Sequence, residues 1–94
     1  MVAAVARAEQ LLGFELRISS GYRDRAQQQY LWERRETNPY PVAPPGTSLH
    51  ERGLAIDVAL SQVAALLRVA DRAGLCHPLP EIDPVHFVAC PIPE

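Results

Sequence analysis

The sequence contains no lysine, one tryptophan, one methionine and two cysteines. All nine basic residues are therefore arginines, and they are spread along the chain without forming a basic stripe. Together with eleven acidic residues they give a formal net charge of -2. Domains that bind nucleic acid usually cluster Lys and Arg on one face. This charge pattern therefore argues against nucleic acid as a partner.

Long hydrophobic runs are missing as well. No stretch reaches the roughly 18 consecutive apolar residues of a membrane-spanning helix, so no membrane span is expected. The first residues show no basic segment followed by an apolar block, so no signal peptide is visible. The sequence does contain 48% hydrophobic residues in a length of 94. That is enough for a modest core and for one domain, which we expect over residues 1–94.

The two cysteines, Cys76 and Cys90, permit one disulfide. In an exported protein it would join the start and the end of the last segment, and it would help a domain that gains little stability from burial alone. The alternative is a pair of small buried thiols. The sequence leaves both interpretations open.

The first half of the chain predicts a helix, a strand and a second helix. Ala-rich residues 2–12 favour a helix that stops at Gly13. Apolar residues alternate with polar ones in Phe14–Ser19, which indicates a strand with one buried face. Asp24 and Gln27 form a capping-box pattern, so a helix is expected from there to about Glu36, with Ala26 and Tyr30 in one row.

The second half predicts a long loop followed by strand, helix and strand. Four prolines make residues 37–49 a loop, and loops of this length are often functional. Residues 53–60 read as a strand that turns Leu54, Ile56 and Val58 to one face and Asp57 to the other. Ser61 is expected to cap a helix that ends at Gly74, and His86–Val88 is the best candidate for the last strand.

Candidate chemistry centres on His50 and Asp57, which lie seven residues apart. An imidazole nitrogen and a carboxylate oxygen are both good zinc ligands, and a catalytic zinc needs three protein ligands and an open position. His86 would complete the set. Taken alone, each histidine is more often a structural residue, and Asp57 has the alternative of a buried salt bridge to an arginine.

Asp83 supplies a carboxylate three residues before His86, and we expect it to act as a general base. Residues three apart on a straight strand face opposite sides, so both can reach one site only if the chain bends, which Pro84 favours. Glu81 is a weaker candidate for the base. His77 has no place in this pattern and is expected at the surface.

Five blocks in this order resemble the M15 family of zinc D-alanyl-D-alanine carboxypeptidases, which includes VanY-like domains. The resemblance extends over residues 18–88, and the Ser-x-His-x6-Asp element with a later Asp-x-x-His is its most specific part. The blocks are Ser19-Ser20-Gly21-Tyr22-Arg23, Gln28, Pro45-Gly46-Thr47-Ser48-Leu49-His50, Gly53-Leu54-Ala55-Ile56-Asp57 and Asp83-Pro84-Val85-His86-Phe87.

The resemblance implies a role for each matching position. It implies that the zinc ligands are His50, Asp57 and His86, and that Asp83 is the catalytic carboxylate. It also implies that Arg23 stabilises the oxyanion, that Ser48 and Tyr22 lie beside the substrate, and that Gln28 is mainly structural. The implied fold is α+β, a small antiparallel sheet packed with about three helices, shared with the hedgehog signalling domain.

The implied function is a zinc-dependent peptidase of the bacterial cell wall that removes the terminal D-alanine from a peptidoglycan stem peptide or precursor. The protein is expected to act at the cell wall, either exported or phage-encoded. One alternative is an L-alanyl-D-glutamate endopeptidase of a lysis enzyme. Another is a non-catalytic wall-binding module. The chain is short for this family, so it is also expected as a piece of a longer protein. A monomer is expected.

Overall fold

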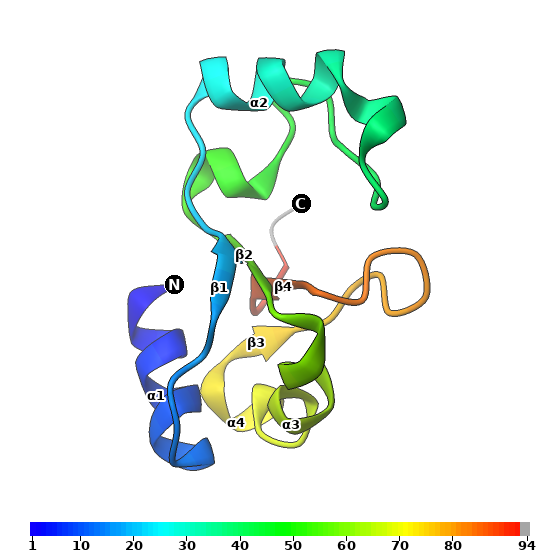
Figure 1. Cartoon of the computed structure of the whole chain (residues 1–94). Coiled ribbons are helices and arrows are strands. Elements are labelled where there is room, and N and C mark those ends of the chain that lie inside the picture. Colours follow the sequence, from blue (N-terminus) through cyan, green and yellow to red (C-terminus); the bar gives the residue numbers. More distant parts are fainter. Residues whose placement is uncertain (93–94) are drawn as a thin grey trace.

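The computed structural model describes residues 1–92, and its four strands form one antiparallel sheet (Figure 1). The order across the sheet is β1-β2-β4-β3. The strands are β1 Ile18–Ser20, β2 Ala55–Val58, β3 Leu75–Cys76 and β4 His86–Ala89. The predicted α+β class is confirmed. The expected single domain over 1–94 includes residues 93–94, which lie outside the described range.

Helices lie at both ends of this sheet (Figure 1). The α-helices are α1 Val2–Leu12, α2 Arg25–Glu33, α3 Val63–Leu67 and α4 Ala70–Ala73, and the 3-10 helices are η1 Arg35–Thr37, η2 Leu49–Arg52 and η3 Leu60–Gln62. α1, α3 and α4 lie together, and α2 lies at the opposite end of the molecule. In the described residues, no helix combines the length and apolar character needed to cross a membrane.

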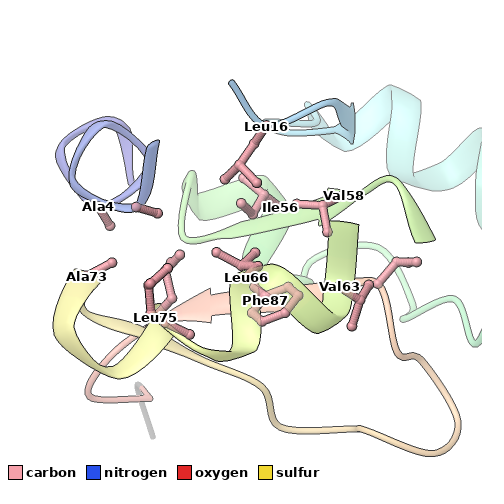
Figure 2. Close-up of a cluster of buried hydrophobic side chains, with 13 residues drawn as sticks. Ala4, Leu16, Ile56, Val58, Val63, Leu66, Ala73, Leu75 and Phe87 are labelled. Carbon is pink, nitrogen blue, oxygen red and sulfur yellow. The ribbon is translucent and has the colours of Figure 1, made fainter. Parts of the chain in front are cut away.

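The hydrophobic core fills the space between the sheet and α1, α3 and α4 (Figure 2). Phe87 and Leu66 are its largest fully buried side chains. Small residues let the helices approach closely, because Ala8 in α1 and Ala73 in α4 are both 0% exposed. The Arg7 side chain also donates to the carbonyl of Ala73, an acceptor that the end of α4 would otherwise leave free.

The two faces of β2 and β4 carry different side chains: one face packs into the core, and the other carries candidate site residues. Ile56 pairs with Phe87 across β2 and β4, and both side chains belong to the core cluster. Asp57 pairs with His86 in the next register position. Successive side chains on a strand alternate between faces. Asp57 and His86 therefore share the face that turns away from the core.

Several predicted element boundaries are wrong, and local hydrogen bonds explain why. The strand expected over Phe14–Ser19 forms only from Ile18, because the Gln62 side chain bonds the carbonyl of Glu15 and the amide of Arg17. Phe14 and Ile18 are exposed. The predicted strand 53–60 likewise shortens to Ala55–Val58.

The helices also differ from prediction. α2 ends at Glu33, short of Glu36, and the expected row at Ala26 and Tyr30 faces solvent. Ser61 lies inside η3 and accepts a hydrogen bond from Arg17, so it does not cap a helix. The helix predicted after it is divided into α3 and α4 by a tight turn. The caps at Gly13, Asp24 and Gly74 are confirmed.

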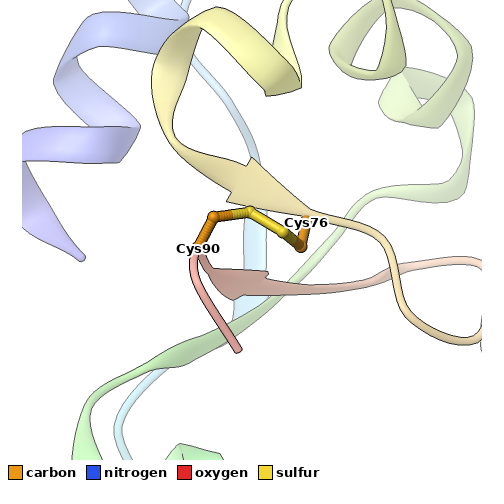
Figure 3. The surroundings of a disulfide bond; sticks show 2 residues. All are labelled: Cys76 and Cys90. Carbon is orange, nitrogen blue, oxygen red and sulfur yellow. A yellow bond between two sulfur atoms is a disulfide. The ribbon is translucent and has the colours of Figure 1, made fainter. Parts of the chain in front are cut away.

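Cys76 and Cys90 form a disulfide with Cα atoms 5.5 Å apart (Figure 3). It ties the end of β3 to the residue that follows β4. The structure thus selects the disulfide over two free thiols. The bridge encloses the segment that carries Asp83 and His86.

Candidate metal centre

Three side chains from η2, β2 and β4 lie close together at one place in the structure. Potential ligand atoms of His50, Asp57 and His86 all lie within 4.8 Å of one another. Asp57 and His86 are brought together by the register of β2 and β4. His50 comes from η2, which begins after Ser48, and its amide donates to the Ser48 hydroxyl at 3.2 Å.

A hydrogen bond at Nδ1 fixes the orientation of the His50 ring. Its Nδ1 lies 2.8 Å from the carbonyl oxygen of Gly21. A carbonyl can only accept a hydrogen bond, so in the neutral ring Nδ1 carries the proton and Nε2 has a free lone pair. Nε2 lies 3.4 Å from Oδ1 of Asp57. Two acceptors facing each other at this distance need a cation between them, either a proton on the ring or a metal ion.

The two distances from Asp57 to the histidine nitrogens are close to those expected around one small metal ion. Nε2 of His50 is 3.4 Å, and Nδ1 of His86 is 3.1 Å, from Oδ1 of Asp57. Zinc bonds of about 2.0–2.1 Å to nitrogen and oxygen give a tetrahedral edge of about 3.3–3.4 Å. Two neutral imidazoles and one carboxylate are a donor set that divalent transition metals accept. These three residues can therefore hold a metal ion.

Asp57 also forms the salt bridge that was the alternative to metal binding. Its Oδ2 lies 3.1 Å from Nη2 of Arg23, while Oδ1 faces the two histidines. Burial acts to raise the pKa of Asp57, but hydrogen bonds from His50 and His86 outweigh it and hold the pKa well below its usual range. Asp57 is thus kept ionised, as a metal ligand requires.

Arg23 is held on three sides. Its Nε donates to Ser20 at 2.9 Å, its Nη1 to the Gln28 side chain at 3.2 Å and its Nη2 to Asp57. The backbone amide of Arg23 donates to the carbonyl of His50 at 3.1 Å, which locks the turn of Arg23 against η2. A guanidinium has five N–H groups. One N–H on each terminal nitrogen therefore remains available to a substrate.

Asp83 lies where the chain bends into β4. The amide of His86 donates to the carbonyl of Asp83 at 3.1 Å across a turn that contains Pro84, so the predicted bend is confirmed. Asp83 is buried, and burial followed by the negative charge of Asp57 raises the pKa of its carboxyl. A raised pKa suits a group that must take up a proton near neutral pH.

A cleft of about 310 Å³ opens over these groups. Arg23, Ser48, His50, Asp57, Asp83 and His86 all line it. Its other lining residues are mainly apolar and come from the proline-rich loop, with Leu31, Leu49 and Leu79 beside them; the loop contributes Asn38, Tyr40, Pro41, Val42, Ala43 and Thr47. The structure thus brings six of the seven predicted site residues into one cleft.

Two candidate site residues, Tyr22 and Glu81, are not among the residues that line the cleft. Tyr22 is 68% exposed and is not among the residues that line the cleft, so its place beside the substrate stays a prediction. Glu81, the weaker candidate for the base, is exposed and also outside the lining. Asp83 is therefore the better placed of the two carboxylates.

Two supporting residues were missed in the sequence. His77 was expected at the surface, but it is half-buried, its Nε2 donates to the carbonyl of Pro84 at 2.7 Å, and its ring stacks on Phe87. Glu51 bonds both Arg25 and the amide of Gly46, and so joins α2 to the proline-rich loop. In the sequence, His77 lies beside a proline and Glu51 lies beside the candidate ligand His50. Neither arrangement indicates which residue the side chain would contact.

Comparison with known proteins gives a family match and a fold match. A family model described as VanY, D-alanyl-D-alanine carboxypeptidase, matches residues 1–75. That range includes His50 and Asp57 and ends before Asp83 and His86. No curated protein matches the sequence.

A solved structure of the LdcB LD-carboxypeptidase, described as revealing the molecular basis of peptidoglycan recognition, resembles the chain with a TM-score of 0.65. The two sequences are 24% identical, and the match covers 89% of this chain and 58% of that one. At this identity the likeness shows the fold. The chain also corresponds to little more than half the length of that protein.

Proposed function

The chain belongs to the VanY family of D-alanyl-D-alanine carboxypeptidases, and from this premise we propose that it is a zinc metallopeptidase that releases the terminal D-alanine from peptidoglycan peptides. The observation that carries the proposal is the convergence of His50, Asp57 and His86 in a cleft that Asp83 and Arg23 also line. The partner would be a stem peptide or its precursor at the bacterial cell wall, bound by a monomer.

Two imidazoles with one carboxylate are a donor set found in catalytic zinc sites, which keep a fourth position open, and the resemblance to the carboxypeptidase family makes zinc the metal that we propose. Bound there, zinc would act as a Lewis acid and allow water to react near neutral pH. The protein's part is to keep His50 in the tautomer that offers Nε2 and to keep Asp57 ionised. The contact from Gly21 supplies the first condition, and the Arg23 guanidinium, 3.1 Å from Oδ2 of Asp57, supports the second.

Asp83 and Arg23 would then act on the substrate. Asp83 takes the proton of the attacking water and returns it to the leaving amine. Arg23 donates its two remaining N–H groups to the oxygen on which negative charge develops. Because Ser20, Gln28 and Asp57 already hold its guanidinium, no reorganisation is needed as the reaction proceeds.

The test combines zinc content with product analysis. The zinc-loaded protein is incubated with a peptide that ends in D-Ala-D-Ala and with intact muropeptides, and the products are weighed by mass spectrometry. Loss of one alanine supports the carboxypeptidase, and a cut within the stem supports the endopeptidase. Zinc-loaded protein that leaves both substrates intact would favour the wall-binding module and contradict the proposal.

Variants assign the roles within the same assay. His50→Ala is expected to lose zinc, whereas Asp83→Asn is expected to keep zinc and lose at least a hundredfold in turnover, at the low end of what general acid–base groups contribute. Glu81→Gln is the matched control, because Glu81 is an exposed carboxylate in the same loop. Undiminished turnover in Asp83→Asn would overturn the assignment of the base.

A further inference from the structure

Gln28 is the one buried residue among the nine described residues of α2, and it is 0% exposed. Its two amide atoms bond in opposite directions. Oε1 accepts from Nη1 of Arg23 at 3.2 Å, and Nε2 donates to the carbonyl of Ala43 at 2.9 Å. One side chain thus joins the guanidinium at the site to the proline-rich segment that forms the cleft wall.

The cleft wall, residues 38–47, depends on such contacts because four of its ten residues are prolines. Pro39, Pro41, Pro44 and Pro45 have no backbone N–H, so the segment cannot anchor itself by strand or helix pairing. Within the described residues, two side chains from outside the segment bond to it, Gln28 at Ala43 and Glu51 at Gly46. Both of these side chains belong to helices that flank the site, α2 and η2.

Gln28 differs from Glu51 because its arginine partner lines the cleft. Glu51 pairs with Arg25, whose side chain is 71% exposed and is not part of the cleft lining. Gln28 bonds Arg23, which lines the cleft and touches the metal ligand Asp57. Among the described hydrogen bonds, Gln28 is the one side chain that joins Arg23 to the cleft wall. A displacement of the wall would therefore be transmitted to Arg23 through Gln28.

We propose that Gln28 is a positioning residue that fixes Arg23 and the cleft wall relative to each other, so that substrate seated on the wall meets an already oriented guanidinium. This rests on the proposed peptidase function and deepens it. Oε1 sets the orientation of Arg23 and hence the rate of the chemical step. Nε2 sets the position of the wall and hence substrate binding.

The two halves of the amide can be separated by substitution. Gln28→Glu keeps an acceptor for Arg23 but places a carboxylate oxygen against the Ala43 carbonyl, so the wall contact alone is lost. Gln28→Met has nearly the same volume and loses both contacts. Gln29→Met is the matched control, because Gln29 is the next residue of α2 and bonds only Glu33, on the exposed face.

The first measurement needs no activity. In zinc-free protein, NMR of arginine side chains follows the exchange of the Nη–H groups of Arg23, one of which bonds Gln28, and hydrogen exchange by mass spectrometry follows residues 38–47. Gln28→Met is expected to speed exchange at both places at least tenfold. Gln28→Glu is expected to speed it in the wall and to leave Arg23 protected. Protection unchanged in both variants would overturn the proposal even if the protein proves to be a different enzyme.

The second measurement uses the zinc-loaded protein and whichever peptide the wild type cleaves. Gln28→Met is expected to lower kcat about tenfold and to raise KM, while Gln28→Glu, which keeps an acceptor for Arg23, is expected to raise KM severalfold and to lower kcat less than Gln28→Met does. A purely structural role would lower the melting temperature of both variants and leave kcat and KM per folded, zinc-loaded molecule at wild-type values. That result would also overturn the proposal, whereas an inactive wild type would contradict the peptidase function alone.

Discussion

Opening the disulfide between Cys76 and Cys90 is expected to destabilise the protein while leaving the folded site intact. The bridge joins residues separated by 14 positions. In the chain-entropy model a closed loop of about 15 residues lowers the entropy of the unfolded chain by about 10 cal/mol/K, or about 3 kcal/mol at 25 °C. A small domain has only about 5–15 kcal/mol in total. The melting temperature should therefore fall by about 12–24 °C.

The native state keeps other contacts at the same place. The amide of Cys90 donates to the carbonyl of Gly74, and the amide of Ala89 donates to that of Leu54, both at 2.9 Å. These bonds hold the end of β4 against its neighbours without the bridge. His86 should thus stay in register with Asp57, and zinc affinity per folded molecule should change by less than about threefold, under 1 kcal/mol.

The assay is urea unfolding of oxidised protein, reduced protein and Cys76→Ala/Cys90→Ala, each with a chelator present. The chelator is needed because metal binding would otherwise stabilise the folded state by mass action. Reduced protein and the double variant control for each other, since only the variant changes side-chain volume. Equal free energies of unfolding for oxidised and reduced protein, within about 1 kcal/mol, would refute the reasoning.

Three further predictions use the same unfolding measurement. Leu66→Ala, at a fully buried position, should cost about 2–5 kcal/mol. His77→Phe keeps an aromatic ring but leaves the carbonyl of Pro84 without its donor, so it should cost about 1–3 kcal/mol and also lower kcat, which a loss of packing alone would not do. Desolvation acts to raise the pKa of Glu51, but hydrogen bonds from Arg25 and the loop amides outweigh it and lower the pKa. The stability that the ionised group contributes is present above its unfolded pKa and is lost as pH falls through the lowered value. The stabilities of wild type and Glu51→Gln should therefore converge as the pH falls below the ordinary glutamate pKa of about 4.5, and a constant difference would contradict this.

Local rules predicted the ends of the elements well. The capping box of Asp24 and Gln27 forms, with the Gln27 amide 2.8 Å from the Asp24 carboxylate, and Gly13 adopts the left-handed conformation that ends α1. Both features depend on residues at most four positions apart. The motif spacing around His50 was equally local, because Ser48 caps the short helix that presents it.

The wrong predictions share a different cause. The strand expected from Phe14 fails because Gln62, 45 positions from Arg17 in the sequence, occupies the backbone groups that a partner strand would need. Glu51 and His77, which the sequence analysis did not assign to the site, likewise support it through partners outside their own elements. A single sequence shows the type of each side chain but not which distant backbone group it will meet.

The position of the proposed metal ligands depends on the hydrophobic core more than on these residues themselves. Asp57 and His86 meet because Ile56 faces Phe87 one register position away, and Phe87 is 0% exposed. A slip of one residue would turn every side chain of β4 to the other face, and it would expose Phe87 while burying His86. The free energy of burying one phenylalanine, about 1.5–3 kcal/mol, is therefore also what holds the third ligand in place. Changes at Phe87 should for this reason weaken zinc binding without touching any ligand, and changes on the exposed face of α2 should not.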